Sequence, residues 1–267
     1  MPDKIVVIIQ ARMTSSRLPG KVMMPILNKS LLVRMTERVN QCAYPIIAVI
    51  ATSTDSSDDI IEREARENNI HCYRGSLNNL LDRHYQAAKL HQADLVIKIP
   101  SDCPLIDPRI IDETLDVYYR NNGVYDYVSN LHPATYPDGN DVEIMTMECL
   151  TRAYSMAKET WELEHTTPVI WEHPEQFYIG NYEWATGLDL SMSHRFTIDY
   201  PEDYLFVLKV YEMLYPGKPN FSCNDILQLL EKHPEIYSIN EKYAGVNWYR
   251  NHLSDLRTIT LEQTKQL

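Results

Sequence analysis

The sequence predicts an α/β protein with a mostly parallel sheet flanked by helices. The continuous apolar stretch Ile5 to Ile9 is typical of a strand buried on both faces. Further strands are expected at 46–51, 71–74 and 94–99, and they alternate with segments of helical periodicity. This alternation predicts a doubly wound sheet through about residue 120, and the carboxyl ends of its strands meet at one edge.

Helices are expected between these strands. The segment 31–39 places two leucines, Met35 and Val39 on one face of a helix. A second helix begins near two serines that can cap it and runs to about residue 67, and a third contains residues 80–90. These helices would flank the sheet and connect its parallel strands.

The middle of the chain has a different pattern. Segments 125–130 and 141–146 are expected to be strands, and the long polar loop between them, residues 132–140, is a candidate lid or acceptor loop. A helix is expected over 147–158, and another ends at Trp171. A short strand is expected to end at Asp199, before a helix that Pro201 opens.

No internal repeat or low-complexity linker interrupts the chain, so residues 1–267 are predicted to form one domain. Residues 216–267 would be a helical C-terminal extension of that domain. Within it, the stretch 243–248 has the character of a packing or dimer element.

The loop after the first strand carries most of the chemistry. It holds Arg12, Arg17 and Lys21 together with Ser15 and Ser16. An arginine offers a planar fork that matches phosphate oxygens, and a lysine offers a point charge. A triphosphate would need such a set at the carboxyl end of a strand, although a solvated basic loop after a core strand is the alternative on spacing alone.

This loop carries a specific motif, Arg12-x-x-Ser15-x-Arg17-Leu18-Pro19-Gly20-Lys21. The motif resembles the signature of the cytidylyltransferases that make CMP-activated sugars, including the CMP-Kdo and CMP-acylneuraminate synthetases. The form that begins Gln10-Ala11-Arg12-Met13 is most similar to the spore coat polysaccharide biosynthesis protein F branch. The resemblance covers most of residues 1 to about 215.

The resemblance implies a glycosyltransferase-A-like nucleotidyltransferase fold. It also implies Mg²⁺-dependent transfer of CMP from CTP to an acidic acceptor, a sugar acid or a phosphorylated small molecule, with release of pyrophosphate. Such a reaction would serve surface polysaccharide or glycoconjugate biosynthesis. Because the family is often dimeric, the resemblance further implies a homodimer.

Two aspartates are the candidate metal ligands. Asp102 lies between two prolines after the fourth strand, where a cap or turn role is the alternative. Mg²⁺ is usually held by one or two carboxylates together with substrate oxygens and water. The resemblance assigns the metal to Asp102 and adds Asp199, which matches the second ligand of the family. Ser101 replaces the glycine that the family carries before the first aspartate.

The remaining candidates surround these groups. By resemblance, the cations Arg12, Arg17 and Lys21 hold the triphosphate and stabilise the leaving pyrophosphate. The acceptor candidates are Asp141, Glu143, His165 and Arg195, although a structural role is the alternative for the last two. The nucleotide candidates are Gln10, Ala11, Arg12, Ser15, Lys21, Thr52, Asp55, Ser76, Arg83 and Ser101.

Composition excludes several other classes of protein. The formal net charge of −12 argues against a nucleic-acid binder, which needs a broad basic surface. The five scattered cysteines form no CxxC pair, which argues against a zinc site or a disulfide framework and suits a reducing cytoplasm. The first apolar stretch is too short for a signal peptide or a membrane span, so no membrane partner is expected.

Two other functions stay open at this stage. A metal-dependent glycosyltransferase using a nucleotide sugar would share the fold, but the segment from Asp102 lacks the D-x-D pair that such enzymes usually carry. A non-catalytic nucleotide-binding partner would keep the cationic loop and need no second carboxylate. Loss of CTP turnover with retained CTP binding would favour that second alternative.

Overall fold

The computed structural model describes residues 3–121 and 123–266 and has a seven-stranded sheet at its centre. Its strand order is β5-β4-β1-β6-β8-β7-β9. β8 runs antiparallel to both of its neighbours, and the other strand pairings in the sheet are parallel, so the predicted mostly parallel sheet is confirmed. The strands are β1 (Ile5–Gln10), β4 (Ile46–Ser53), β5 (His71–Gly75), β6 (Leu95–Pro100), β7 (Tyr127–Ser129), β8 (Glu143–Thr146) and β9 (Ile179–Asn181).

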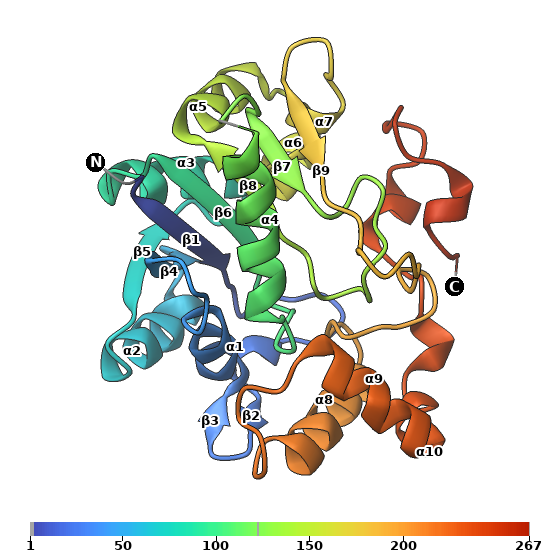
Figure 1. The fold of residues 1–267 in the computed structure, drawn as a ribbon. Helices are drawn as coiled ribbons and strands as arrows, with labels where there is room; N and C mark the ends of the chain where they lie inside the picture. Colours follow the sequence, from blue (N-terminus) through green and yellow to red (C-terminus); the bar gives the residue numbers. More distant parts are fainter. Residues whose placement is uncertain (1–2, 122, 267) are drawn as a thin grey trace.

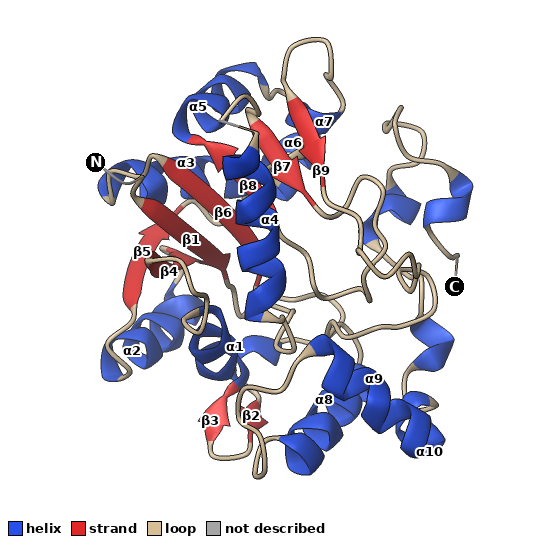
Figure 2. Ribbon diagram, viewed as in Figure 1, coloured by secondary structure: helices blue, strands red, loops and turns tan. Residues whose placement is uncertain are grey.

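Helices flank the sheet, as Figures 1 and 2 show. In Figure 1, α4 crosses in front of the sheet, while α8, α9 and α10 form a group below it. None of the described helices has both the length and the apolar composition that a membrane crossing requires. The helices are α1 (Leu31–Val39), α2 (Asp59–Glu67), α3 (Leu80–Leu90), α4 (Pro108–Arg120), α5 (Met147–Met156), α6 (Thr160–His165), α7 (Pro168–Trp171), α8 (Pro201–Leu214), α9 (Cys223–Lys232) and α10 (Pro234–Tyr237).

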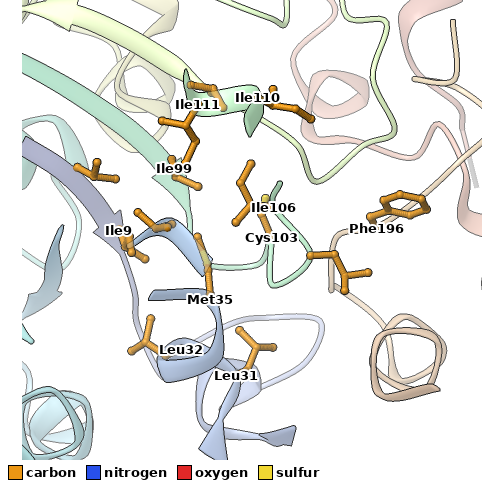
Figure 3. Close-up of a cluster of buried hydrophobic side chains, with 14 of the residues drawn as sticks. Ile9, Leu31, Leu32, Met35, Ile99, Cys103, Ile106, Ile110, Ile111 and Phe196 are labelled. Carbon is orange, nitrogen blue, oxygen red and sulfur yellow. The ribbon is translucent and has the colours of Figure 1, made fainter. Parts of the chain in front are cut away.

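The core lies on both faces of the sheet because successive strand residues point in opposite directions. In β1, Val7 and Ile9 pack in the cluster that contains side chains of α1, α4, α8 and α9. Val6 and Ile8 pack in the opposite cluster with α3, α5 and α7. Figure 3 shows the first cluster, where Ile9 and other apolar side chains lie between the sheet and α1. Burial on both faces explains why β1 reads as a continuous apolar stretch.

Side chains at the helix starts explain where several helices begin. Ser30 Oγ accepts a hydrogen bond from the Val33 amide at 3.3 Å and caps α1. Asp107 caps α4 through the Arg109 amide at 3.1 Å, with a proline as the first helical residue. The second oxygen of Asp107 accepts from the Cys223 amide at 2.8 Å, so the same carboxylate fastens α9 to α4.

The structure differs from the sequence-based predictions in several local features. The expected strand before Asp199 is an irregular segment whose backbone bonds to other loops, with Ile198 N donating to Asp102 O at 2.9 Å. The strand expected from Asp141 begins two residues later, at Glu143. A short hairpin, β2 (Pro25–Ile26) and β3 (Lys29–Ser30), and the strand β9 were not predicted. Beyond α10, the tail contains short 3-10 turns rather than α-helices.

Candidate functional site

A cavity of about 780 Å³ opens at the carboxyl ends of β1 and β6. Its lining comes from the loop after β1, the loop after β6, the loop between β7 and β8, the end of α6, residues 189–199 and the tail. The location is the one expected for an open α/β sheet, where ligands bind beyond the carboxyl ends of the strands. Segments far apart in the sequence therefore build one site.

Lys21 lines this cavity and has only 7% of its surface exposed. Gly20 precedes it with φ of +74°, a left-handed conformation that glycine adopts without strain, and this turns the chain into the cavity. Lys21 Nζ donates to Asp102 Oδ2 at 2.8 Å, to Asp199 Oδ1 at 3.0 Å and to Ile198 O at 2.6 Å. Burial alone would lower the pKa of Lys21, but the carboxylates of Asp102 and Asp199 raise it above its usual value. The ammonium is therefore charged at neutral pH.

Two arginines complete the charge balance around Asp199. Arg17 Nη2 lies 2.6 Å from Asp199 Oδ1. Arg195, only 2% exposed, donates from Nη2 to Asp199 Oδ2 at 3.0 Å, from Nη1 to Asp138 Oδ2 at 3.1 Å and from Nε to Asp203 Oδ1 at 3.0 Å. Arg195 thus joins three carboxylates in one buried network, and it contacts the site through Asp199 and Asp138.

A glycine makes part of this network possible. Gly139 has φ of +102°, and a Cβ there would lie 2.7 Å from the backbone of Phe196. Its absence lets the loop between β7 and β8 approach the irregular segment closely enough for Phe196 N to donate to Asp138 O at 2.6 Å. Asp138 is thereby held against Arg195.

The acid sensitivity of the fold should reflect Asp199. Burial opposes its ionisation, but Lys21, Arg17 and Arg195 together lower the pKa of Asp199 to about 2. Because this pKa lies below the unfolded value of about 3.9, the carboxylate adds about 2 kcal/mol to the free energy of unfolding above pH 4, which disappears as the pH falls towards 2. Urea unfolding at several pH values would show a steeper acid loss for wild type than for Asp199→Asn. Equal pH dependence in the two proteins would contradict this assignment.

The two candidate metal ligands converge on one point. Asp102 Oδ2 and Asp199 Oδ1 both accept from the Lys21 ammonium, so the two carboxylates face one cationic group. In the part of the chain that the structure describes, no cluster of three or more His, Cys, Asp or Glu side chains could hold a metal. Two carboxylates are enough for Mg²⁺ when substrate oxygens and water complete its coordination, so the donor set fits that ion.

The nucleotide candidates divide into two groups. Gln10, Ala11, Arg12, Ser15, Lys21, Arg83 and Ser101 line the cavity. Thr52, Asp55 and Ser76 lie outside the set of described residues that line it. Thr52 is fully buried, Asp55 caps the turn at Ser56–Asp58, and Ser76 Oγ accepts from the Asn79 amide at 3.1 Å.

Arg83 is the most unusual member of the first group. It is fully buried, and burial together with the positive charge of Arg12 lowers its pKa to about 10. Nη1 donates to Ala51 O at 3.3 Å, while Nε has no hydrogen-bond partner among the described residues. Gln10 Oε1 is likewise buried and unpaired within the described chain. Both side chains retain hydrogen-bonding capacity beside the cavity.

All four acceptor candidates line the cavity, with different surroundings. Burial raises the pKa of Asp141 to about 6. Glu143 is buried, forms an ion pair with Lys98 and accepts from Tyr127 Oη at 2.6 Å. His165 stacks on Trp248 with 3.7 Å between ring centroids, and burial lowers its pKa to about 3, so the imidazole is neutral at pH 7.

Sequence reasoning missed several residues of this cavity. Lys98 was detectable, because a lysine inside the apolar stretch 95–99 needs a buried partner or a ligand. Asp138 lies in the polar loop 132–140 and was not among the candidates, although it pairs with Arg195. Trp248 lay in a stretch with no chemical signal, and its place in the cavity depends on how the tail folds back.

Comparison with known proteins gives a consistent result. The sequence pattern of a family described as cytidylyltransferase matches residues 6–243. The spore coat polysaccharide biosynthesis protein SpsF of Bacillus subtilis is 30% identical over 244 residues, which cover 90% of this chain and 99% of that protein.

Solved structures show the same likeness. A cytidylyltransferase from Leptospira borgpetersenii serovar Hardjo-bovis is 33% identical with a TM-score of 0.83, covering 88% of this chain and 97% of that one. A CMP:2-keto-3-deoxy-manno-octonic acid synthetase complexed with CTP shares the fold at 19% identity and a TM-score of 0.61, covering 78% and 98%. This chain therefore belongs to the cytidylyltransferase family and has the nucleotidyltransferase fold of these relatives.

Proposed function

We propose that this protein transfers the CMP group of CTP to an acidic acceptor and releases pyrophosphate, with Mg²⁺ as the metal. The observation that carries the proposal is that Arg17 and Lys21 form ion pairs with Asp102 and Asp199 in the lining of one cavity. The cations suit a triphosphate and the carboxylates suit a divalent ion. Similarity to SpsF supports a role in surface polysaccharide biosynthesis.

The reaction requires little acid–base chemistry from the protein. An anionic acceptor oxygen attacks the α-phosphorus in line, forming one P–O bond while the bond to the β-phosphate oxygen breaks and pyrophosphate leaves. Lys21 and Arg17 stabilise the negative charge that grows on the leaving group, and Arg12 extends this positive surface. A metal held by Asp102 and Asp199 would neutralise charge on the phosphate oxygens. Positioning and electrostatics therefore supply most of the rate enhancement.

The proposal also includes the cellular compartment, the oligomeric state and the domain organisation of the enzyme. Cys42, Cys72, Cys103, Cys149 and Cys223 are all free thiols, which supports a reducing cytoplasm. By analogy with the family, we expect a homodimer. We further propose that residues 1–267 form one domain, with residues 216–267 as a C-terminal extension.

The test is pyrophosphate release with Mg²⁺, each of four nucleoside triphosphates, and a panel of acidic sugars and small phosphates. We expect release with CTP and one acceptor class. Asp102→Asn should lower kcat by about 10²-fold or more because a ligand for the metal is lost, whereas the exposed Asp59→Asn, outside the cavity, should retain it. Equal rates with ATP or UTP would contradict the assigned base, and CTP binding without release under every condition would favour a non-catalytic nucleotide-binding protein.

A further inference from the structure

The C-terminal tail, residues 244–266, lies beyond the end of the family match at residue 243 but lines the same cavity. In Figure 1 the tail, in red, rises from α10 towards the end of the sheet that carries β7 and β9. A 3-10 turn, Trp248–Asn251, presents the tail's aromatic side chains to the cavity. The family match therefore ends at residue 243, whereas residues that line the cavity continue as far as Gln263.

Six rings that line the cavity form one contiguous cluster, which we call the aromatic wall. Its members are His132, His165 and Trp171 from the body of the domain and Trp248, Tyr249 and His252 from the tail. Trp248 lies at its centre, because its ring centroid is 3.7 Å from His165, 4.7 Å from Tyr249 and 5.8 Å from His252. His132 and Trp171 continue the surface at 4.5 Å from each other.

The tail is fastened on both sides of these rings. Arg195 Nη1 donates to Val246 O at 2.7 Å, so the arginine that bonds Asp199 also holds the start of the tail. Further along, the buried Glu172 accepts from the Arg257 amide at 2.7 Å and from the Thr258 amide at 2.9 Å. The aromatic wall is therefore held in place before any ligand binds, which reduces the entropy cost of binding.

The wall differs chemically from the rest of the cavity. Arg12, Arg17 and Lys21 provide the charge that a triphosphate needs, and the unpaired polar atoms of Gln10 and Arg83 lie beside the sheet rather than on the tail. Aromatic faces pack against C–H groups and exclude water, but they offer little to a small, fully hydrated anion. The aromatic wall thus suits a part of the substrate that carries C–H groups, rather than its phosphates or the groups that bind the metal.

We propose that the tail selects the acceptor: Trp248 and its neighbours pack against the apolar C–H face of a ring-shaped acid, whose charged group points towards the cationic loop. This inference rests on the proposed function and narrows its acceptor from any acidic molecule to a cyclic one. An acyclic phosphate would leave the aromatic wall uncovered and gain nothing from it. Trp248 is therefore a specificity-determining residue supplied from outside the family pattern.

The test is titration calorimetry of the full-length chain with CTP and EDTA present, so that no turnover occurs. The probes are 3-deoxy-manno-octulosonate, a cyclic sugar acid, and glycerol 3-phosphate, an acyclic phosphate. We expect the cyclic acid to bind more tightly, Trp248→Ala to weaken it about tenfold, and Trp248→Tyr, which keeps an aromatic face, to retain most of the affinity. The matched control is Trp184→Ala, because Trp184 is also a stacked tryptophan, 5.0 Å from the cavity-lining Tyr136, but is not itself part of the described cavity lining.

Three results would overturn the inference. The cyclic acid could bind Trp248→Ala as well as wild type, it could bind no more tightly than glycerol 3-phosphate, or Trp248→Ala could weaken CTP itself tenfold. The last result would assign the aromatic wall to the cytosine base. Failure of the proposed function has a different signature, namely a wild-type chain that releases no pyrophosphate from CTP with any acceptor, whether or not CTP binds.

Discussion

Replacing Lys21 by alanine should lower kcat/KM for pyrophosphate release by about 10²- to 10³-fold, the usual effect of losing one preorganised donor at a developing negative charge. Lys21 is held by three contacts in a buried position, so its ammonium is already fixed where charge grows. Arg17 is more exposed, and its guanidinium bonds Asp199 from a separate position on the loop. We therefore expect no compensation from the neighbouring cation.

The fold should survive this substitution, because Asp199 keeps Arg17 and Arg195 as partners. Thermal unfolding of Lys21→Ala would establish this before the rates are compared. The matched control is Lys29→Ala, whose exposed lysine pairs with Glu37 outside the described cavity lining and should keep wild-type rates. A folded Lys21→Ala variant with near-wild-type turnover would exclude the assigned role of this lysine.

The sequence carried enough information for the parallel half of the sheet. Strands such as Ile5–Gln10 are buried on both faces, so a continuous apolar stretch identifies them without knowledge of their neighbours. The juxtaposition of Lys21 with Asp102 follows in part from the same logic, because β1 and β6 are parallel neighbours whose carboxyl ends share one edge. The hydrophobic pattern of each strand and the geometry of a parallel sheet were together sufficient to predict these features.

Other features depend on contacts that no local pattern encodes. The strand β9 has three residues and exists because it pairs with β7, about fifty positions earlier. Asp199 was expected to end a strand, but its segment bonds to the loops at Asp138 and Asp102 instead of to a sheet. The aromatic wall was missed for the same reason, since Trp248 meets His165 only after the tail has folded back. Contacts between residues far apart in the sequence, rather than local conformational propensity, determine the strand β9, the segment at Asp199 and the aromatic wall.

Arg195 is the residue whose loss should cost the fold most. Arg195→Met keeps much of the side-chain volume but removes the guanidinium donors that Arg195 directs to Asp138, Asp199 and Asp203. Removing one partner of a buried ion pair typically costs about 3–5 kcal/mol, because the remaining charges stay desolvated without compensation. We expect a loss of that size in the free energy of unfolding at pH 7, measured by urea denaturation. The control is Arg120→Ala, whose exposed pair with Asp116 should contribute less than about 1 kcal/mol.

The pH dependence separates lost charge compensation from lost packing. Without Arg195 the buried carboxylates repel each other, and protonation removes this repulsion. The difference in the free energy of unfolding between Arg195→Met and wild type should therefore become smaller as the pH falls from 7 to 4. If the variant is less stable only because it packs poorly, the difference in the free energy of unfolding would be independent of pH. That result would contradict the assignment of Arg195 to a buried charge network. The same variant should also lose activity at temperatures where it is fully folded, because Arg195 orients Asp199 and holds the tail at Val246. One buried side chain thus connects the stability of the fold, the proposed metal ligand and the wall that we propose selects the acceptor.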